Sequence, residues 1–303
     1  MLTTQQKTFL GLLIFTAFAL FIEYYIGWLS LLKPWWSIAP LSLALALLLL
    51  LISYALRSLR LCFFFHRELR GSFPLTLRLM LQHNLSNNLL PMRSGELAFP
   101  LLMKHYFAIP AIRSLPALLW FRVLDLHTLG LLALPTIVVP TLGALWAVTL
   151  CAAWLVLPWV LFRWGTASEA WLAQRDQQRL TELAHRFAQG LPRTYGLFLG
   201  SWWWTLVNWI VKLGVFVWIL QLFVELDALP ALLGVIGGEV TSVLPVHSLA
   251  GMGTYEAGIM AALLPWGIDT KSALHGAVNL HLFLLAASLL GGMVTWLLPR
   301  TRQ

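Results

Sequence analysis

The chain has 303 residues, of which 59% are hydrophobic and only 11% are charged, and it carries 16 tryptophans and 17 phenylalanines. Soluble domains are about 45–50% apolar and about 25% charged, so this composition excludes a soluble enzyme or binding domain. It predicts an all-α integral membrane protein. The formal net charge of +8 fits the cytoplasmic excess of Lys and Arg in membrane proteins better than it fits nucleic-acid binding.

Apolar runs of roughly 20 residues, the length that crosses a bilayer, occur along most of the chain. They predict about six membrane helices, at 8–29, 39–57, 114–138, 142–163, 195–224 and 272–298. The first run has no small-residue cleavage site, so we expect a membrane helix there and not a removed signal peptide. The whole chain, 1–303, is expected to form a single transmembrane domain.

Two further apolar regions, 75–109 and 229–266, are interrupted by Pro, Gly and charged residues. Neither is a clean span. Each predicts a pair of half-helices that enters the membrane, breaks and returns. Backbone that leaves the helix inside a membrane must be buried in protein or face a wet cavity, so these breaks are candidate functional positions.

The longest polar interval, 164–193, predicts one amphipathic helix. Thr166 and Glu169 fit an N-terminal capping box, and Gly190 fits a C-terminal stop. Four apolar side chains share one face: Leu172, Leu180, Leu183 and Phe187. We expect this helix to lie on the cytoplasmic membrane surface, and docking to a partner protein is the alternative.

Basic residues are distributed unequally between the two sides of the membrane. If the N-terminus is cytoplasmic, most of the arginines outside the predicted spans fall inside: Arg57, Arg60, Arg67, Arg70, Arg163, Arg175, Arg179, Arg186, Arg193, Arg300 and Arg302. The opposite side receives Lys33, Lys271, Glu225, Asp227 and Asp269. The asymmetry predicts a multi-pass membrane protein with both termini in the cytoplasm.

Under this topology the two interrupted segments enter from opposite sides. The sequence LPMRSGE in the first is similar to LPVHSLAGMGTYE in the second, so that Ser94 matches Ser248 and Glu96 corresponds to Glu256. This similarity predicts an inverted repeat, with repeat 1 at 39–138 and repeat 2 at 195–298. Two ordinary kinked helices with an accidental similarity are the alternative.

Ionisable residues inside predicted membrane segments are costly and mark function by default. The set comprises Arg93, Glu96, Arg122, Asp125, Lys212, Glu239 and Glu256, with His127, His247 and His281. Arg122 and Asp125 lie three residues apart and can pair, either as a structural brace or as a headgroup contact. Glu96 and Glu256 each follow a break, where they could cap a helix or relay a proton.

Arg93 and His247 hold similar places in the two repeats and are the best candidates to contact a phosphate. Lys212 lies near the middle of its span and is expected to face a cavity. Cys62 and Cys151 are expected to be packing residues. Neither a metal-ligand spacing nor a hydrolase motif occurs, and Ser94 has no evident base, so we expect no metal, no cofactor and no enzymatic activity.

The ordered motifs LPMRSGE, FRVLD and LPVHSLAGMGTYE resemble the transmembrane family of lysylphosphatidylglycerol synthases. That family's pattern is approximately LP-x-R-x-GE, ER-x-x-D and LP-x-x-x-G-G-x-G-x-x-E, and the resemblance covers nearly the whole chain. Phe121 stands where the family often has Glu, and Ala250 where Gly is common. The resemblance implies a lipid flippase of the cell inner membrane, here as a stand-alone member without the aminoacyl-transferase domain.

The motif positions and their neighbours imply a headgroup cavity between the repeats, formed by Arg93, Ser94, Glu96, Arg122, Asp125, Lys212, His247, Gly251, Gly253 and Glu256. The expected function is transport of an anionic phospholipid or lipid-linked intermediate between leaflets. The expected partners are membrane lipids and not nucleic acid, with a homo-oligomer left open. An accessory protein or enzyme partner in hopanoid, glycolipid or isoprenoid-lipid synthesis is the alternative, and a small-solute transporter is a third.

Overall fold

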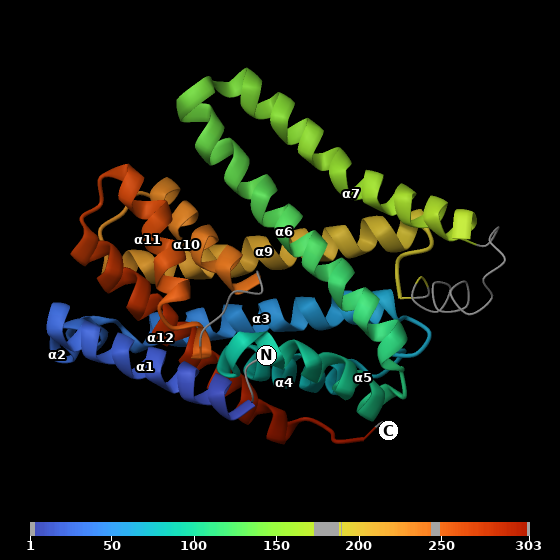
Figure 1. The fold of residues 1–303 in the computed structure, drawn as a ribbon, viewed down its shortest axis with the longest axis horizontal. Helices are drawn as coiled ribbons and strands as arrows, with labels where there is room; N and C mark the ends of the chain where they lie inside the picture. Colours follow the sequence, from blue (N-terminus) through green and yellow to red (C-terminus); the bar gives the residue numbers. More distant parts are fainter. Residues whose placement is uncertain (1–3, 173–187, 189, 244–248, 302–303) are drawn as a thin grey trace. The chain divides into compact units, whose positions relative to one another are not determined.

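A computed structural model describes residues 4–172, 188, 190–243 and 249–301, and every regular element in these residues is a helix (Figure 1). The α-helices are α1 (Thr4–Tyr25), α2 (Trp28–Leu32), α3 (Pro40–Phe64), α4 (Phe73–Leu89), α5 (Ala98–Phe107), α6 (Ala111–Leu142), α7 (Ala144–Leu172), α9 (Tyr195–Phe223), α10 (Ala228–Val243), α11 (Thr254–Leu263) and α12 (Thr270–Val294). Short 3-10 helices are η1 (Lys33–Ser37), η2 (Pro91–Leu97), η3 (Leu249–Gly251), η4 (Leu264–Trp266) and η5 (Thr295–Leu297).

Four helices of the described chain are long and apolar enough to cross a membrane: α3, α6, α9 and α12 with η5. A fifth span is added if Phe15–Tyr25 and Trp28–Ser37, which meet at 85°, are counted together. The sequence predicts about six spans, and the described residues support four or five. The helix predicted at 8–29 ends earlier than expected, at Tyr25, because Gly27 adopts a φ of +85° that an α-helix cannot continue through.

Two other predicted boundaries also differ. The helix predicted at 39–57 is α3, which continues to Phe64, so Arg57 and Arg60 lie inside the helix. The helix predicted at 142–163 is α7, which begins after Gly143 and runs to Leu172, so it passes through Thr166 where the amphipathic helix was predicted to begin. The remainder of that predicted helix, at 173–187 and 189, lies outside the described residues.

Both interrupted segments consist of a helix, a break and a shorter helix. In the first, the 17-residue α4 is followed by η2 and the 10-residue α5. In the second, the 16-residue α10 precedes η3 and the 10-residue α11. A long helix stands before and after each segment, so the order long helix, half-helix, break, half-helix, long helix occurs twice along the chain.

The chain divides into two compact units. Unit 1 contains Met1–Ser53, Leu81–Glu96 and Ile210–Leu297, and unit 2 contains Tyr54–Met80, Leu97–Trp209 and Leu298–Gln303. Each unit has its own cluster of buried apolar side chains.

In unit 1, α10 and α11 form a tightly packed hairpin. A methyl group added at Gly237 would collide with the carbonyl of Gly258, and one added at Gly258 would collide with that of Gly237. The two backbones therefore touch, as small residues allow between membrane helices. A polar contact joins α4 to α12, where Ser288 Oγ accepts hydrogen bonds from Asn88 Nδ2 at 2.6 Å and Asn84 Nδ2 at 3.2 Å.

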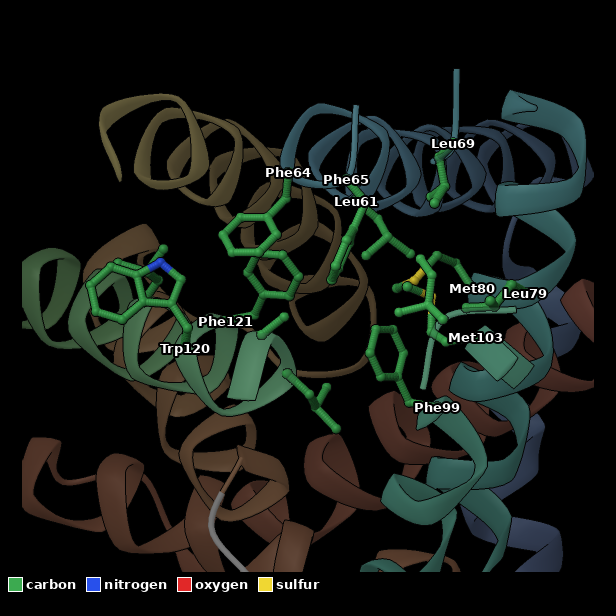
Figure 2. Close-up of a cluster of buried hydrophobic side chains, with 14 of the residues drawn as sticks. Leu61, Phe64, Phe65, Leu69, Leu79, Met80, Phe99, Met103, Trp120 and Phe121 are labelled. Atoms are coloured by element: carbon green, nitrogen blue, oxygen red, sulfur yellow. The ribbon is translucent and has the colours of Figure 1, made fainter. Parts of the chain in front are cut away.

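Unit 2 is held by an aromatic and aliphatic core. Figure 2 shows side chains of the end of α3, the start of α4, α5 and α6 that meet there, among them Leu61, Phe64, Phe65, Leu79, Met80, Phe99, Met103, Trp120 and Phe121. The rings of Phe64 and Phe121 are in edge contact with centroids 5.1 Å apart. In the same unit, Trp154 of α7 stacks on His127 of α6, and Gly130 leaves the room that the indole occupies.

Candidate functional site

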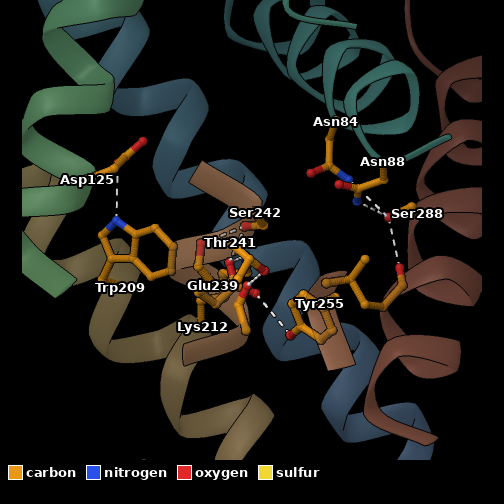
Figure 3. Close-up of polar contacts among 12 residues, drawn as sticks. Asn84, Asn88, Asp125, Trp209, Lys212, Glu239, Thr241, Ser242, Tyr255 and Ser288 are labelled. Atoms are coloured by element: carbon orange, nitrogen blue, oxygen red, sulfur yellow. Dashed lines mark hydrogen bonds and ion pairs between the residues drawn. The ribbon is translucent and has the colours of Figure 1, made fainter. Parts of the chain in front are cut away.

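In unit 2, the carboxylate of Asp125 is buried in the middle of α6. Its Oδ1 accepts hydrogen bonds from Arg60 Nη1 at 2.9 Å and from the indole nitrogen of Trp209 at 3.1 Å. Figure 3 shows the contact with Trp209. Asp125 Oδ2 lies 3.4 Å from Arg122 Nη1. Arg60 also donates to Thr205 Oγ1 at 2.8 Å, and the carboxylate is only 1% exposed.

This group of residues, which we call the Asp125 cluster, has more positive than negative charge. Arg60 is buried and lies over the ring of Phe121 at 4.4 Å, while the half-buried Arg57 lies over the ring of Trp209 at 5.9 Å. Three arginines thus surround one carboxylate. Phe121 stands where the family pattern has Glu, so an aromatic face occupies a position where a second carboxylate would offset the excess charge.

Within unit 1, Lys212, Glu239 and Tyr255 form a buried polar network. Lys212 Nζ on α9 lies 2.6 Å from Glu239 Oε2 on α10, and both side chains are buried. Figure 3 shows this pair with Tyr255, whose hydroxyl donates to Glu239 Oε1 at 3.3 Å. Ser242 Oγ also lies 3.2 Å from Glu239 Oε2. The lysine predicted to face a cavity is therefore held by a salt bridge.

Glu256 contacts both the backbone at the start of α11 and a histidine of α12. Its Oε2 accepts a hydrogen bond from the backbone N–H of Gly253 at 2.7 Å, which caps the start of α11. Its Oε1 lies 2.7 Å from Nδ1 of His281 on α12, and the His281 ring packs against Tyr255 with centroids 4.7 Å apart. The predicted capping role is present, together with a histidine partner on α12.

The backbone before α11 explains the glycines of this motif. Gly251 and Gly253 have φ values of +76° and +80°, the left-handed region that glycine adopts at least cost. Ala250, where the family pattern has Gly, also adopts a positive φ of 52°. A Cβ in that conformation costs roughly 1–2 kcal/mol, so Ala250 places a small strain in the break.

In the first break, Glu96 lies close to a histidine as Glu256 does, but at a longer distance. Glu96 Oε2 is 3.7 Å from His83 Nε2 on α4, and Ser94 is exposed. Gly95 lies directly on the backbone of Ser86 and Asn87, where any side chain would collide. This close approach holds η2 against the C-terminal turns of α4.

Of the predicted site residues, Arg122 with Asp125, and Gly253 with Glu256, are brought together. The side chain of Arg93 and all of His247 lie outside the described residues. Sequence reasoning missed Arg60 and Trp209 as partners of Asp125. The sequence predicts that Arg60 lies on the cytoplasmic flank, beyond a helix ending at residue 57. The helix continues to Phe64, and the Arg60 side chain is buried within it.

Cysteines and metal ligands add nothing further to the site. Cys62 and Cys151 are free and half-buried. Within the part of the chain that the structure describes, no three His, Cys, Asp or Glu side chains are grouped so that they could hold a metal ion.

The family model for the lysylphosphatidylglycerol synthase TM region matches residues 8–292 of the chain. The chain belongs to this family. No curated protein and no solved structure matches it. Membership, together with the long apolar helices, identifies a multi-pass membrane protein of a family associated with lipid function.

Proposed function

We propose that the protein moves an anionic phospholipid or lipid-linked intermediate between the leaflets of the cell inner membrane, without itself being an enzyme. The observation that carries this proposal is the Asp125 cluster. Buried charge inside membrane helices is expensive unless compensated, and among the described residues Arg60 and Arg122 both contact the single carboxylate of Asp125. A phosphate group arriving in the bilayer would supply the compensating negative charge.

Within the cluster the arginines have different roles. Arg60 is fixed by its short contacts to Asp125 and Thr205 and is almost fully buried. Arg122 has the longer 3.4 Å contact and a side chain that is 19% exposed. We assign Arg122 the headgroup contact, because a guanidinium can present two parallel N–H donors to a phosphate while Asp125 orients it.

Lipid transport by this route keeps the acyl chains in the bilayer while the headgroup follows a polar path. The alternative, an unpaired phosphate in hydrocarbon, is prohibitively costly. The repeated order of helices and breaks supports two structural repeats, and we propose that they have opposite orientations, as is recurrent in transporters. Both termini are then cytoplasmic.

The network of unit 1 suggests how such transport could be driven. Glu256 and His281 are a buried carboxylate and imidazole in contact, so a proton added to or removed from this pair changes the charge beside the break. We propose that the pair couples proton binding to the conformation of the second interrupted segment, with the Lys212–Glu239 salt bridge as its fixed neighbour.

A reconstituted vesicle assay tests the proposed function. Fluorescent phosphatidylglycerol should change leaflet in vesicles that contain the protein, and Arg122→Gln should slow this about tenfold or more, since one charge-assisted hydrogen bond is lost. Lys271→Gln, an exposed substitution at the start of α12, should leave the rate unchanged. Equal lipid sidedness in protein-containing and empty vesicles would refute transport, and a gene deletion that alters lipid composition without altering sidedness would favour the accessory role.

A further inference from the structure

Unit 2 contains a pocket that the proposed transport route does not use. It has a volume of about 530 Å³ and is lined at the end of α3, in the following loop, at the start of α6 and at the start of α9. Its lining residues are Phe64, Phe65, His66, Arg67, Glu68, Arg113, Leu191, Arg193, Thr194 and Leu197. The volume lies within the range of small-molecule sites, about 300–1,000 Å³.

The pocket is basic. Arg67, Arg113 and Arg193 contribute three guanidinium groups, and Glu68 contributes the single carboxylate. Arg67 and Arg193 are exposed to solvent at the pocket. Three arginines converging on one depression favour a ligand with at least two negative charges or several anionic oxygens.

Arg113 contacts both a charged and an aromatic residue that line the pocket. Its Nη1 lies 2.6 Å from Glu68 Oε1, and its guanidinium lies over the ring of Phe65 at 5.5 Å. Its Nε is buried and has no hydrogen-bond partner among the described residues. Such a donor costs about 1–3 kcal/mol while unsatisfied, and a ligand oxygen reaching it would remove that cost.

The start of the 29-residue α9 supplies a further feature suited to an anion. Thr194 Oγ1 accepts a hydrogen bond from the N–H of Leu197 at 3.2 Å, so its hydroxyl proton can still be donated to a ligand. N–H groups in the first turn of a helix have no acceptor within the helix and carry its positive dipole end. Both lie beside Arg193 at the rim.

We propose that this pocket binds a phosphate group, presented either by a lipid headgroup or by a free phosphate compound. The pocket lies where three membrane-spanning helices begin or end, and the ends of such helices lie at the level of the headgroups. It differs from the Asp125 cluster, which lies in the middle of α6. The site therefore goes beyond the proposed transport path, and lipid movement is not needed to detect it.

Binding to the purified full-length chain tests the proposal in two arms. In detergent, titration with inorganic phosphate followed by calorimetry measures a free-anion site. In nanodiscs, retention of phosphatidylglycerol against phosphatidylcholine, measured by native mass spectrometry, reports a headgroup site. Arg67→Gln combined with Arg193→Gln should weaken binding in the responsive arm at least about tenfold, since even one lost charge-assisted contact contributes about that factor.

Two further variants separate binding from folding and from general charge. Arg70→Gln removes an exposed arginine of the same loop that does not line the pocket, and it should leave binding unchanged. Glu68→Gln should strengthen binding about fivefold, because it removes the competing carboxylate from Arg113. Binding in neither arm, or equal loss with Arg70→Gln, would overturn the site, whereas failure of the vesicle assay alone would bear only on transport.

Discussion

At the scale of single residues, the molecule is defined by where it places charge in a hydrophobic chain. Asp125 is nearly inaccessible, and its oxygens contact Arg60, Arg122 and Trp209. A carboxylate so placed is stable only with its partners, and the arginines depend on it equally. The cluster therefore behaves as one unit, in which the effect of each substitution depends on what remains.

Replacing Asp125 alone should destabilise the protein more than replacing Asp125 and Arg60 together. We expect Asp125→Leu to lower the free energy of unfolding by about 3–5 kcal/mol, because Arg60 is left buried without its counter-charge. Arg60→Met together with Asp125→Leu should recover much of that loss. Unfolding of the purified variants, followed by tryptophan fluorescence, measures both. A double variant as unstable as the sum of the two single variants would contradict this account.

The sequence predicted half of this cluster. Arg122 and Asp125 could be paired because three residues on one helix form a local contact that spacing reveals. Arg60 could not, because an arginine near the end of an apolar run looks the same whether the helix ends before it or continues past it. Likewise, Glu239 and His281 were recognised as costly residues, but only packing identifies Lys212 and Glu256 as their partners.

At the scale of elements, the α10–α11 hairpin depends on glycine. Helix backbones that touch at Gly237 and Gly258 leave no room for a methyl group. The sequence predicted the break between these helices from its Pro and Gly content. It did not predict the bend at Gly27, because the apolar run continues through that position and hides the change of direction.

Alanine substitutions can test the contact between the two half-helices. Gly237→Ala should lower the free energy of unfolding by about 1–3 kcal/mol, because α10 must move away from α11. Gly214→Ala on α9 has open space around it and should be neutral or stabilising by up to about 1 kcal/mol, through helix propensity alone. Thermal unfolding of both variants in the same detergent compares them. Equal destabilisation at the two positions would refute a specific backbone contact.

The start of α12 provides an element with a pH response. Hydrogen bonds from Ser272, and from the backbone N–H of Lys271, lower the pKa of the exposed Asp269 below its ordinary value of 3.8. A carboxylate whose pKa is lower in the folded state contributes stability above its unfolded pKa, and this contribution is lost as pH falls through the folded value.

Comparison of capping variants at two pH values should reveal this contribution. At about pH 6, wild type should unfold at a higher temperature than Asp269→Ala, and the gap should narrow in acid as the pH falls through the folded-state pKa of Asp269 and the carboxyl becomes protonated. Asp269→Asn keeps a cap that does not titrate, so its advantage over Asp269→Ala should persist at both pH values. A wild-type advantage that does not shrink in acid would exclude the charged cap as its source.

At the scale of the whole molecule, the sequence predicted the class correctly, because composition and the lengths of apolar runs report directly on the membrane. The number of spans was less accessible, since length alone does not show whether a helix such as α1 bends. Orientation is a different kind of property. It follows from the arginine distribution and is fixed during insertion, so its test requires the protein in its membrane.

Labelling of single cysteines tests the proposed inverted topology. In a background lacking Cys62 and Cys151, Arg70→Cys precedes α4 and Glu225→Cys precedes α10, and both positions are exposed. If the two interrupted segments enter from opposite sides, an impermeant maleimide should label Glu225→Cys in intact spheroplasts. Arg70→Cys should react only after lysis, and so should Arg300→Cys if the C-terminal end is cytoplasmic as proposed. Labelling of Arg70→Cys and Glu225→Cys from the same side would eliminate the inverted repeat while leaving the family and the Asp125 cluster in place.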